Sequence, residues 1–206
     1  AAGSAGLSGL EFIYAMPGSV GGALWMNARC YGVSINERIA WVEFIGPAGE
    51  RDRYFPREED FTYKRSPFQD GTRIITRVAF TLRPGQPGKI RRLMDEHKED
   101  RERKGHFRYP CAGSVFKNNR DFGAPSGRLI DALGLKGTRI GQAMIAPFHG
   151  NIIINLGGAK ASEILALIEL VEKRVAEAYG FSLEREVLLV GDWPEKQRKG
   201  GTQCGI

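Results

Sequence analysis

The stretch NIIINLGGAKASEILALIELVEKRVAEAYG, residues 151–180, has the clearest secondary-structure pattern in the chain. Its first five residues form an apolar run between two asparagines, which predicts a short buried strand. Gly157 and Gly158 mark a turn after this run. Apolar residues then recur at helical spacing until Gly180, a residue type that commonly ends helices; they are Ile164, Leu167, Ile168, Val171 and Val175. This half of the chain is therefore predicted to contain a buried strand followed by an amphipathic helix.

The residues on either side of this stretch predict shorter elements. RYPCAGSVFKNN, residues 108–119, is too rich in turn formers to be a helix. Ser126 can cap a short helix that ends at Gly134. The residues that this helix would bury are Leu129, Ile130 and Leu133. Residues 186–190 predict a closing strand, whereas residues 194–206 have no periodicity and predict a mobile tail.

Glycine is frequent in the first third of the chain, and two alternating runs follow it. Residues 39–45 and 73–82 predict strands of an antiparallel or mixed sheet, joined by a turn at residues 46–50. One face of the second strand would be formed by Ile74, Thr76, Val78, Phe80 and Leu82. A helix should begin after Pro87-Gly88 and fray near Gly105. Its inner side would carry Ile90, Leu93, Met94 and His97.

Composition excludes several classes of protein. The chain is 42% apolar, and no run reaches the roughly 20 apolar residues of a membrane span. The three cysteines lie far apart without metal-ligand spacing, so we expect no disulfide framework, no metal site and a reducing, cytoplasmic setting. A net charge of +6 suits an anionic ligand such as a diphosphate, or simply a solvated basic surface. No recognition helix, aromatic RNA-binding pattern or zinc spacing supports nucleic-acid binding.

The segment GLEFIYAMPGSVGGALWMNARCYG, residues 9–32, contains a tight bend of small residues before an apolar stretch. Backbone without Cβ atoms can approach a ligand closely, and successive N–H groups in such a bend can hold a phosphate or the edge of a flat ring. The bend matches neither the Walker loop nor the dinucleotide-binding fingerprint. A structural turn without a ligand is an equally good interpretation of this segment alone.

Four stretches occur in the order and approximate spacing of one enzyme family. They are GLEFIYAMPGSVGGALWMNA at residues 9–28, FTYKRSPF at 61–68, CAGSVFKNN with LIDALGLKG at 111–119 and 129–137, and LEREVLLVG at 183–191. Each stretch is weak by itself, but their combination resembles the UDP-N-acetylmuramate dehydrogenase family, also called UDP-N-acetylenolpyruvoylglucosamine reductase. The likeness covers residues 3–193 and is greatest to the form of the family with a shorter substrate-side loop.

The resemblance implies a fold and a chemistry. Residues 1–104 would be the second half of an FAD-binding domain of the PCMH/vanillyl-alcohol-oxidase type, residues 105–185 an α+β substrate-binding domain, and residues 186–193 a returning strand. NADPH would reduce FAD, and the reduced flavin would reduce the enolpyruvyl double bond of a UDP-sugar during bacterial peptidoglycan synthesis in the cytoplasm. Because the chain starts without Met, we expect it to lack a preceding FAD-binding segment and to hold flavin poorly. The alternative is a non-catalytic fragment that binds a UDP-sugar or another anion.

The resemblance also assigns catalytic roles. Ser114, in GSVFKN, corresponds to the family's proton donor, and Glu186, in LEREV, to a glutamate that faces the developing charge. The family's arginine falls on Lys64, with Arg65 next to it. Because neighbours on a strand point to opposite faces, Lys64 is the better candidate, although lysine lacks the planar fork of arginine. Without the resemblance, Ser114 would be interpreted as a turn residue and the two cations as a solvated basic turn.

The remaining assignments complete the expected site. Flavin would contact the bend and the asparagine after it, namely Pro17, Gly18, Ser19, Gly21, Gly22 and Asn27. Substrate would contact Tyr63, Lys117 and Asn118, and Lys117 is also a candidate to stabilise the oxyanion of Ser114. Arg139 could reach a pyrophosphate, although a surface arginine after a turn is the more common outcome. His149 is predicted to be a satisfied structural histidine rather than an acid, and no residue is assigned to a metal.

Overall fold

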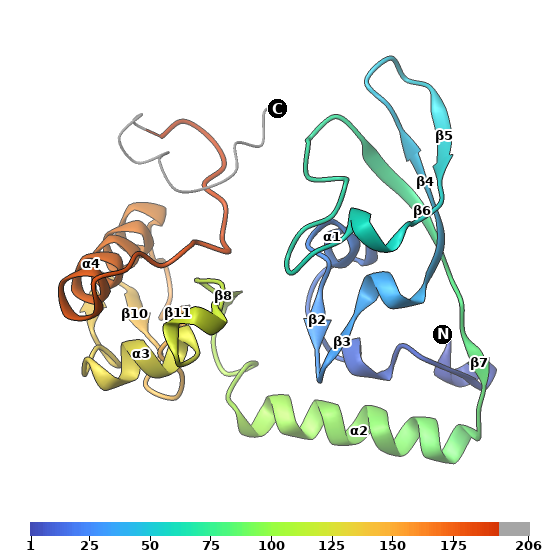
Figure 1. The fold of residues 1–206 in the computed structure, drawn as a ribbon. Helices are drawn as coiled ribbons and strands as arrows, with labels where there is room; N and C mark the ends of the chain where they lie inside the picture. The colour runs from blue at the N-terminus through green and yellow to red at the C-terminus, as the bar shows by residue number, and fades with distance from the viewer. Residues whose placement is uncertain (194–206) are drawn as a thin grey trace. The chain divides into compact units, whose positions relative to one another are not determined.

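The computed structural model describes residues 1–193, which fall into two compact units, Ala1–Asp100 and the residues from Arg101 onward. Each unit has its own antiparallel sheet and its own buried core (Figure 1). The combination of helices with antiparallel strands confirms the α+β content that the sequence predicts. The predicted tail at residues 194–206 lies outside the described residues.

A three-stranded antiparallel sheet in the order β5–β4–β6 forms the centre of the first unit. Its strands are β4 (Ile39–Ile45), β5 (Arg51–Tyr54) and β6 (Ile74–Phe80). The short helix α1 (Val20–Trp25) packs against it, and Leu24, Val42 and Phe68 are buried together in this core. Both predicted strands are present. The turn at residues 46–50, however, leads into β5, a strand that the alternating runs did not predict.

The faces of β6 differ from the predicted ones. Ile74 is 67% exposed, and it is Ile75 that packs with Val78 on the core. The cause is a shift in the β4–β6 register, where Glu43 pairs with Arg77 but Phe44 pairs with Ile75. One extra residue on β6 therefore bulges out of the ladder, and it moves all side chains beyond it to the opposite face.

Two small antiparallel pairs and a long helix complete the first unit. β1 (Leu7–Ser8) pairs with β7 (Arg83–Pro84), and β2 (Arg29–Cys30) pairs with β3 (Val33–Ser34). The helix α2 (Pro87–Arg103) follows β7 as predicted. Leu93 is exposed, contrary to the prediction, because the inward stripe of α2 is narrow: it follows Ile90 and Met94. Short 3₁₀ helices lie at Gly3–Ala5, Glu11–Ile13, Ile35–Arg38 and Glu58–Asp60.

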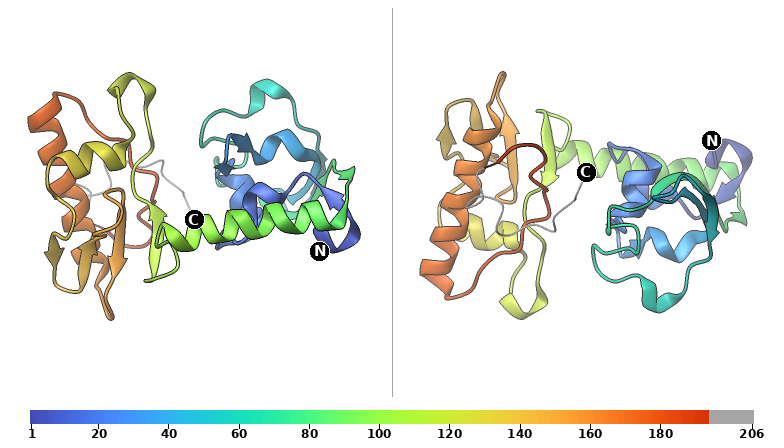
Figure 2. Two further views of the ribbon diagram at one scale, coloured as in Figure 1. Left: turned by 90° about the horizontal axis from the view of Figure 1, so that it is seen from below. Right: turned by 90° about the horizontal axis from the view of Figure 1, so that it is seen from above.

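The second unit is a four-stranded antiparallel sheet in the order β8–β11–β10–β9. The strands are β8 (Cys111–Ser114), β9 (Arg139–Ile140), β10 (Ala143–Ile145) and β11 (Ile152–Asn155). The helix α4 (Ala161–Tyr179) lies along one side of the sheet (Figure 2), and its apolar stripe fills the core. The buried strand and the amphipathic helix predicted for residues 151–180 are thus confirmed. Gly180 ends α4 in a left-handed conformation, as predicted.

The helix α3 (Ser126–Ala132) is present, but its capping differs from the prediction. Ser126 does not cap it, since its hydroxyl donates to Lys117 O at 2.6 Å. The cap comes from Asn118, whose Oδ1 accepts the Ser126 N–H at 3.0 Å. Gly134 follows the helix with φ of 68°, two residues after its last member. A further 3₁₀ helix, Arg120–Phe122, precedes α3.

Residues 186–190 are not the closing strand that the sequence predicted. The chain makes one isolated antiparallel bridge, between Phe116 and Arg185, and then leaves the sheet. Alternating hydrophobicity indicates a strand but cannot reveal how much partner backbone is available. In this fold the partner is only the short extension of β8, so the pairing stops after one bridge.

Candidate functional site

Ser114 is the last residue of β8, where it pairs with Ile152 of β11. Its side chain is exposed, and within residues 1–193 its hydroxyl has no hydrogen-bond partner. Cys111 pairs with Ile154, so β8 holds one residue more than β11 between the two pairs. This bulge contains Gly113, whose φ of 82° favours glycine. Ser114 is therefore an accessible group at a strand end and not a turn residue.

Glu186, near the end of the second unit, contacts the residue that follows Ser114. Its N–H donates to Val115 O at 2.7 Å, and its side chain is half-buried. Arg185 next to it is buried, and its guanidinium donates to both carboxylate oxygens of Glu172 on α4, at 2.5 and 2.6 Å. The hydrogen bond to Glu172 raises the pKa of Arg185 above its ordinary value. The structure therefore holds the backbone of Glu186 against that of Val115, the residue that follows Ser114.

Lys117 and Asn118 have local partners. Lys117 Nζ lies 2.6 Å from Glu184 Oε1, and its backbone N–H donates to Glu184 O at 2.9 Å. Its charge is thus neutralised within the unit, which does not fit the predicted role in stabilising the Ser114 oxyanion. Asn118 caps α3. Both residues hold the chain beyond Ser114 in place.

Tyr63, Lys64 and Arg65 belong to the first unit and lie in a tight turn. The backbone N–H and C=O groups of Thr62 bond to those of Arg65, which leaves Tyr63 and Lys64 as the two central residues. Lys64 has a left-handed φ of 58° and is half-buried, whereas Tyr63 and Arg65 are exposed. The premise that Lys64 and Arg65 are neighbours on a strand is therefore wrong. The turn is fastened by Gln69, whose Nε2 donates to Lys64 O at 3.0 Å.

The bend of small residues forms the start of α1. Ser19 is its N-cap, and its Oγ accepts the Gly22 N–H at 3.0 Å. Residues 17–20 are exposed, and a Cβ atom on Gly18, whose φ is 132°, would meet no atom within 4 Å. Open backbone of this kind fits the edge of a flat ring or a phosphate. The predicted flavin contacts at Pro17 and Gly18 are therefore sterically possible, whereas Gly21 is half-buried in α1.

Asn27 does not fit the predicted contact with flavin. It is buried in the first unit with φ of 44°, and both polar atoms of its side chain are used internally. Nδ2 donates to Thr62 O at 2.9 Å, and Oδ1 accepts the Asn36 N–H at 3.3 Å. Asn27 therefore connects the end of α1 to the Thr62–Arg65 turn.

Two further residues of the second unit can be placed. His149 is a satisfied structural histidine as predicted, because its Nδ1 accepts the Asn151 N–H at 3.1 Å. Burial lowers the pKa of His149 below its ordinary value. Arg139 donates from Nε to Gly141 O at 2.6 Å and from Nη2 to Gln142 Oε1 at 2.8 Å, so it fastens the turn between β9 and β10.

The second unit resembles proteins with a known family name. A family model described as UDP-N-acetylenolpyruvoylglucosamine reductase, C-terminal domain, matches residues 105–190. The protein of that name from Treponema denticola is 47% identical over 199 residues, which cover 91% of this chain and 62% of the relative. That from Borreliella burgdorferi is 43% identical over 185 residues, 90% of this chain and 61% of the relative.

The chain is thus similar to UDP-N-acetylenolpyruvoylglucosamine reductases along most of its own length. A crystal structure of the reductase from Thermus caldophilus matches it with a TM-score of 0.75 at 39% sequence identity, over 90% of this chain and 65% of that one. The likeness therefore extends over both units. The chain spans a little under two thirds of the length of these reductases.

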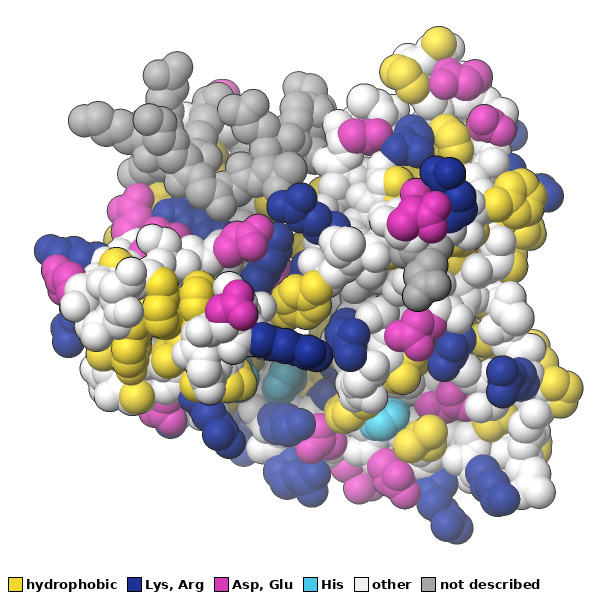
Figure 3. Space-filling view, in the orientation of Figure 1, with side chains coloured by type: hydrophobic (Ala, Val, Ile, Leu, Met, Phe, Trp, Pro, Cys, Tyr) yellow, Lys and Arg dark blue, Asp and Glu magenta, His cyan; other side chains and the backbone are white. Residues whose placement is uncertain are grey.

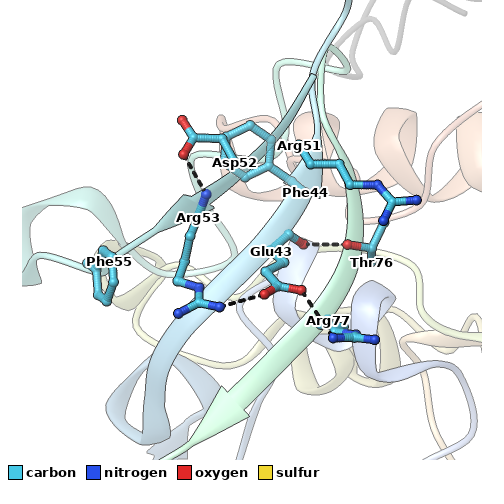
Figure 4. A pocket seen from close by; sticks show the side chains of 8 residues that line it. All are labelled: Glu43, Phe44, Arg51, Asp52, Arg53, Phe55, Thr76 and Arg77. Atoms are coloured by element: carbon cyan, nitrogen blue, oxygen red, sulfur yellow. Dashed lines mark hydrogen bonds and ion pairs between the residues drawn. The ribbon is translucent and has the colours of Figure 1, made fainter. Parts of the chain in front are cut away.

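A hollow on the sheet of the first unit does not coincide with any site residue assigned from the reductase family (Figure 4). Glu43 is central to it, with Arg53 Nη2 at 2.7 Å and Arg77 Nη1 at 3.7 Å. The lining holds three arginines against Glu43 and Asp52, and two of these arginines are paired with Glu43, so we give the hollow no functional assignment. Figure 3 likewise shows Lys and Arg side chains interspersed with Asp and Glu on the face drawn.

The resemblance to the reductases did not reveal the residues that hold Ser114 and Glu186 in place. Asn151, which bonds to the backbone beyond Ser114, is 35 residues from its partner, and Glu172 is 13 residues from Arg185. An asparagine beside an apolar run resembles a strand boundary, and a glutamate on a helix resembles a solvated face, so neither gives a signal in the sequence. In residues 1–193 no cluster of three His, Cys, Asp or Glu side chains is suited to a metal, and no helix is long and apolar enough to span a membrane.

Proposed function

We propose that the protein takes part in the reduction of UDP-N-acetylenolpyruvoylglucosamine to UDP-N-acetylmuramate in peptidoglycan synthesis, in the bacterial cytoplasm. The similarity to proteins named UDP-N-acetylenolpyruvoylglucosamine reductase supports the reaction class. The structural observation that carries the proposal is the exposed Ser114 hydroxyl beside Glu186, with Val115 between them. The likeness to a solved reductase across both units supports the same fold for the whole chain.

The first unit would serve flavin and the second would serve substrate. We assign residues 1–104 to part of an FAD-binding domain of the PCMH type and residues 105–185 to substrate binding. FAD, reduced by NADPH, would supply the hydride. The exposed backbone at residues 17–20 and the cap at Ser19 would contact it, whereas the side chain of Asn27 already has internal hydrogen bonds.

Ser114 would protonate the carbon next to the one that receives hydride. The Ser114 O–H bond breaks as the new C–H bond forms, and the alkoxide then regains a proton from water. A serine hydroxyl is a weak acid, so this step requires a strongly basic carbanion or a stabilised alkoxide. Lys117 is bonded to Glu184 and is not assigned that task.

The carboxylate end of the substrate needs a cation. Lys64 is the candidate that we favour, since it occupies the family's arginine position in the Thr62–Arg65 turn, with Arg65 as the alternative. Lysine offers a point charge without a planar fork. Lys64→Arg should therefore preserve or improve turnover, and abolished activity in a folded Lys64→Arg protein would favour Arg65.

Pre-steady-state kinetics on the full-length protein test the assignment of Ser114. We expect Ser114→Ala to leave flavin reduction by NADPH unchanged and to slow flavin reoxidation by the enolpyruvyl substrate, because only the second half-reaction consumes the proton. Ser114→Cys keeps a proton donor at the same atom position and is the matched control, with reoxidation retained. Equal losses in both half-reactions would refute the role of Ser114. A colourless full-length protein that still binds a UDP-sugar would instead support a non-catalytic binding function.

A further inference from the structure

Asn151 precedes β11 and is only 3% exposed. Its side chain bonds to both backbone groups of Phe116: Oδ1 accepts the Phe116 N–H at 2.9 Å, and Nδ2 donates to Phe116 O at 2.8 Å. Its backbone O accepts the Val115 N–H at 3.0 Å. A side-chain amide therefore continues the pairing of β8 with β11 beyond the point where the two strands end.

These bonds are important because Val115 lies between the two candidate catalytic groups. Ser114 directly precedes Val115 in the chain, and Val115 O accepts the Glu186 N–H at 2.7 Å. We propose that Asn151 is a positioning residue that fixes Val115 and Phe116, and thereby sets the placement of Ser114 relative to Glu186 for proton transfer. This inference rests on the proposed function.

The task requires an amide side chain. Asparagine both donates and accepts, so it satisfies the N–H and the C=O of one buried peptide residue at once, whereas aspartate can only accept. Asn151 is itself anchored, since its own N–H donates to His149 Nδ1 at 3.1 Å. Without the side chain, the buried groups of Phe116 would have to find other partners, and the backbone next to Ser114 would shift. A displacement of about 1 Å in a reacting group can lower a rate by about 100-fold.

The test measures both half-reactions in the full-length protein. We expect Asn151→Ala to slow flavin reoxidation by the enolpyruvyl substrate by about 100-fold, while flavin reduction by NADPH and the KM for substrate change little. Asn155→Ala is the matched control. Asn155 ends β11, and its Oδ1 accepts the N–H groups of Gly157 and Ala159 at 2.8 and 3.0 Å, away from the Ser114 segment. We expect this control to keep both half-reactions.

Amide hydrogen exchange supplies a readout that is independent of activity. In Asn151→Ala the amides of Val115, Phe116 and Glu186 should lose protection while those of α4 keep it. If Asn151→Ala fails to fold, Asn151→Ser takes its place, because its hydroxyl is neutral and polar but cannot satisfy both backbone groups of Phe116 at once.

The outcomes separate the positioning role from the proposed function. Normal reoxidation in Asn151→Ala beside slow reoxidation in Ser114→Ala would overturn the positioning role alone, and so would equal slowing by Asn155→Ala. Normal reoxidation in Ser114→Ala would overturn the proton-donor assignment, and the positioning role with it.

Discussion

The ion pair between Arg185 and Glu172 allows a quantitative test of how the Glu186 segment is held. Arg185 is 7% exposed, and its guanidinium binds both carboxylate oxygens of Glu172. Removal of one partner from a buried pair costs about 3–5 kcal/mol. The Glu172 side chain is 26% exposed, and Glu169 also attracts Arg185. We therefore expect Glu172→Gln to lower the free energy of unfolding by about 3 kcal/mol, the lower end of that range.

Equilibrium unfolding in urea measures this loss. With a slope of about 2 kcal/mol per molar urea, a loss of about 3 kcal/mol moves the midpoint by about 1.5 M. Glu177→Gln is the control on the same helix, since Glu177 pairs with Lys173 at 3.8 Å on the exposed surface and should contribute less than about 0.5 kcal/mol. The double variant Arg185→Met/Glu172→Leu should recover much of the stability, because it removes both charges together.

The result that would refute the reasoning is a Glu172→Gln midpoint no lower than that of Glu177→Gln. The buried pair would then stabilise the protein no more than an exposed ion pair does. A double variant that is as unstable as Glu172→Gln would show instead that Arg185 acts through its packing rather than through its charge.

Three further predictions concern other residues. Burial lowers the pKa of His149, so the unfolded chain binds its proton more readily, and the free energy of unfolding should fall as pH drops below about 6.5; His149→Gln should remove this part of the pH dependence in urea titrations. Asn27→Ala removes two part-buried hydrogen bonds, to Thr62 O and from the Asn36 N–H, and should cost about 1–3 kcal/mol in the same measurement, and a loss below about 0.5 kcal/mol would contradict the internal role of Asn27. Burial and the hydrogen bond to Asp60 raise the pKa of Tyr54, so the stability that wild type gains over Tyr54→Phe should be constant up to about pH 10 and shrink above it, whereas an unchanged difference at high pH would argue against the bond.

The sequence predicted those features in which local periodicity and core packing agree. The apolar pattern that predicts β11 and α4 is visible within 30 residues. The charged and apolar stripes of residues 87–103 likewise predict α2. The faces of β6 were predicted wrongly because strict alternation assumes an unbroken register. The extra residue of β6 between the Glu43–Arg77 and Phe44–Ile75 pairs moves the side chains before it to the opposite face.

The candidate site was predictable only in part, for a different reason. The motifs named Ser114 and Glu186, but their proximity depends on a hydrogen bond between segments about 70 residues apart, which no local pattern encodes. Lys64 lies in a turn because its left-handed φ is compatible with two hydrogen bonds between Thr62 and Arg65. The family resemblance assigned Asn27 to flavin, but no local pattern shows that its side chain bonds internally to Thr62 O and to the Asn36 N–H.

The extra residue in β8 also makes the protein easy to label beside its candidate site. Because Cys111 and Ser114 pair with Ile154 and Ile152, which share one face of β11, the exposed thiol of Cys111 lies on the same side of the sheet as the Ser114 hydroxyl. A fluorophore attached to Cys111, with the two other cysteines replaced by serine, would therefore report when a ligand arrives next to Ser114. Deletion of Gly113 would remove the bulge and leave the two positions two residues apart on a regular strand, where they again share a face, so the labelled deletion variant would test whether the bulge itself is needed for the response.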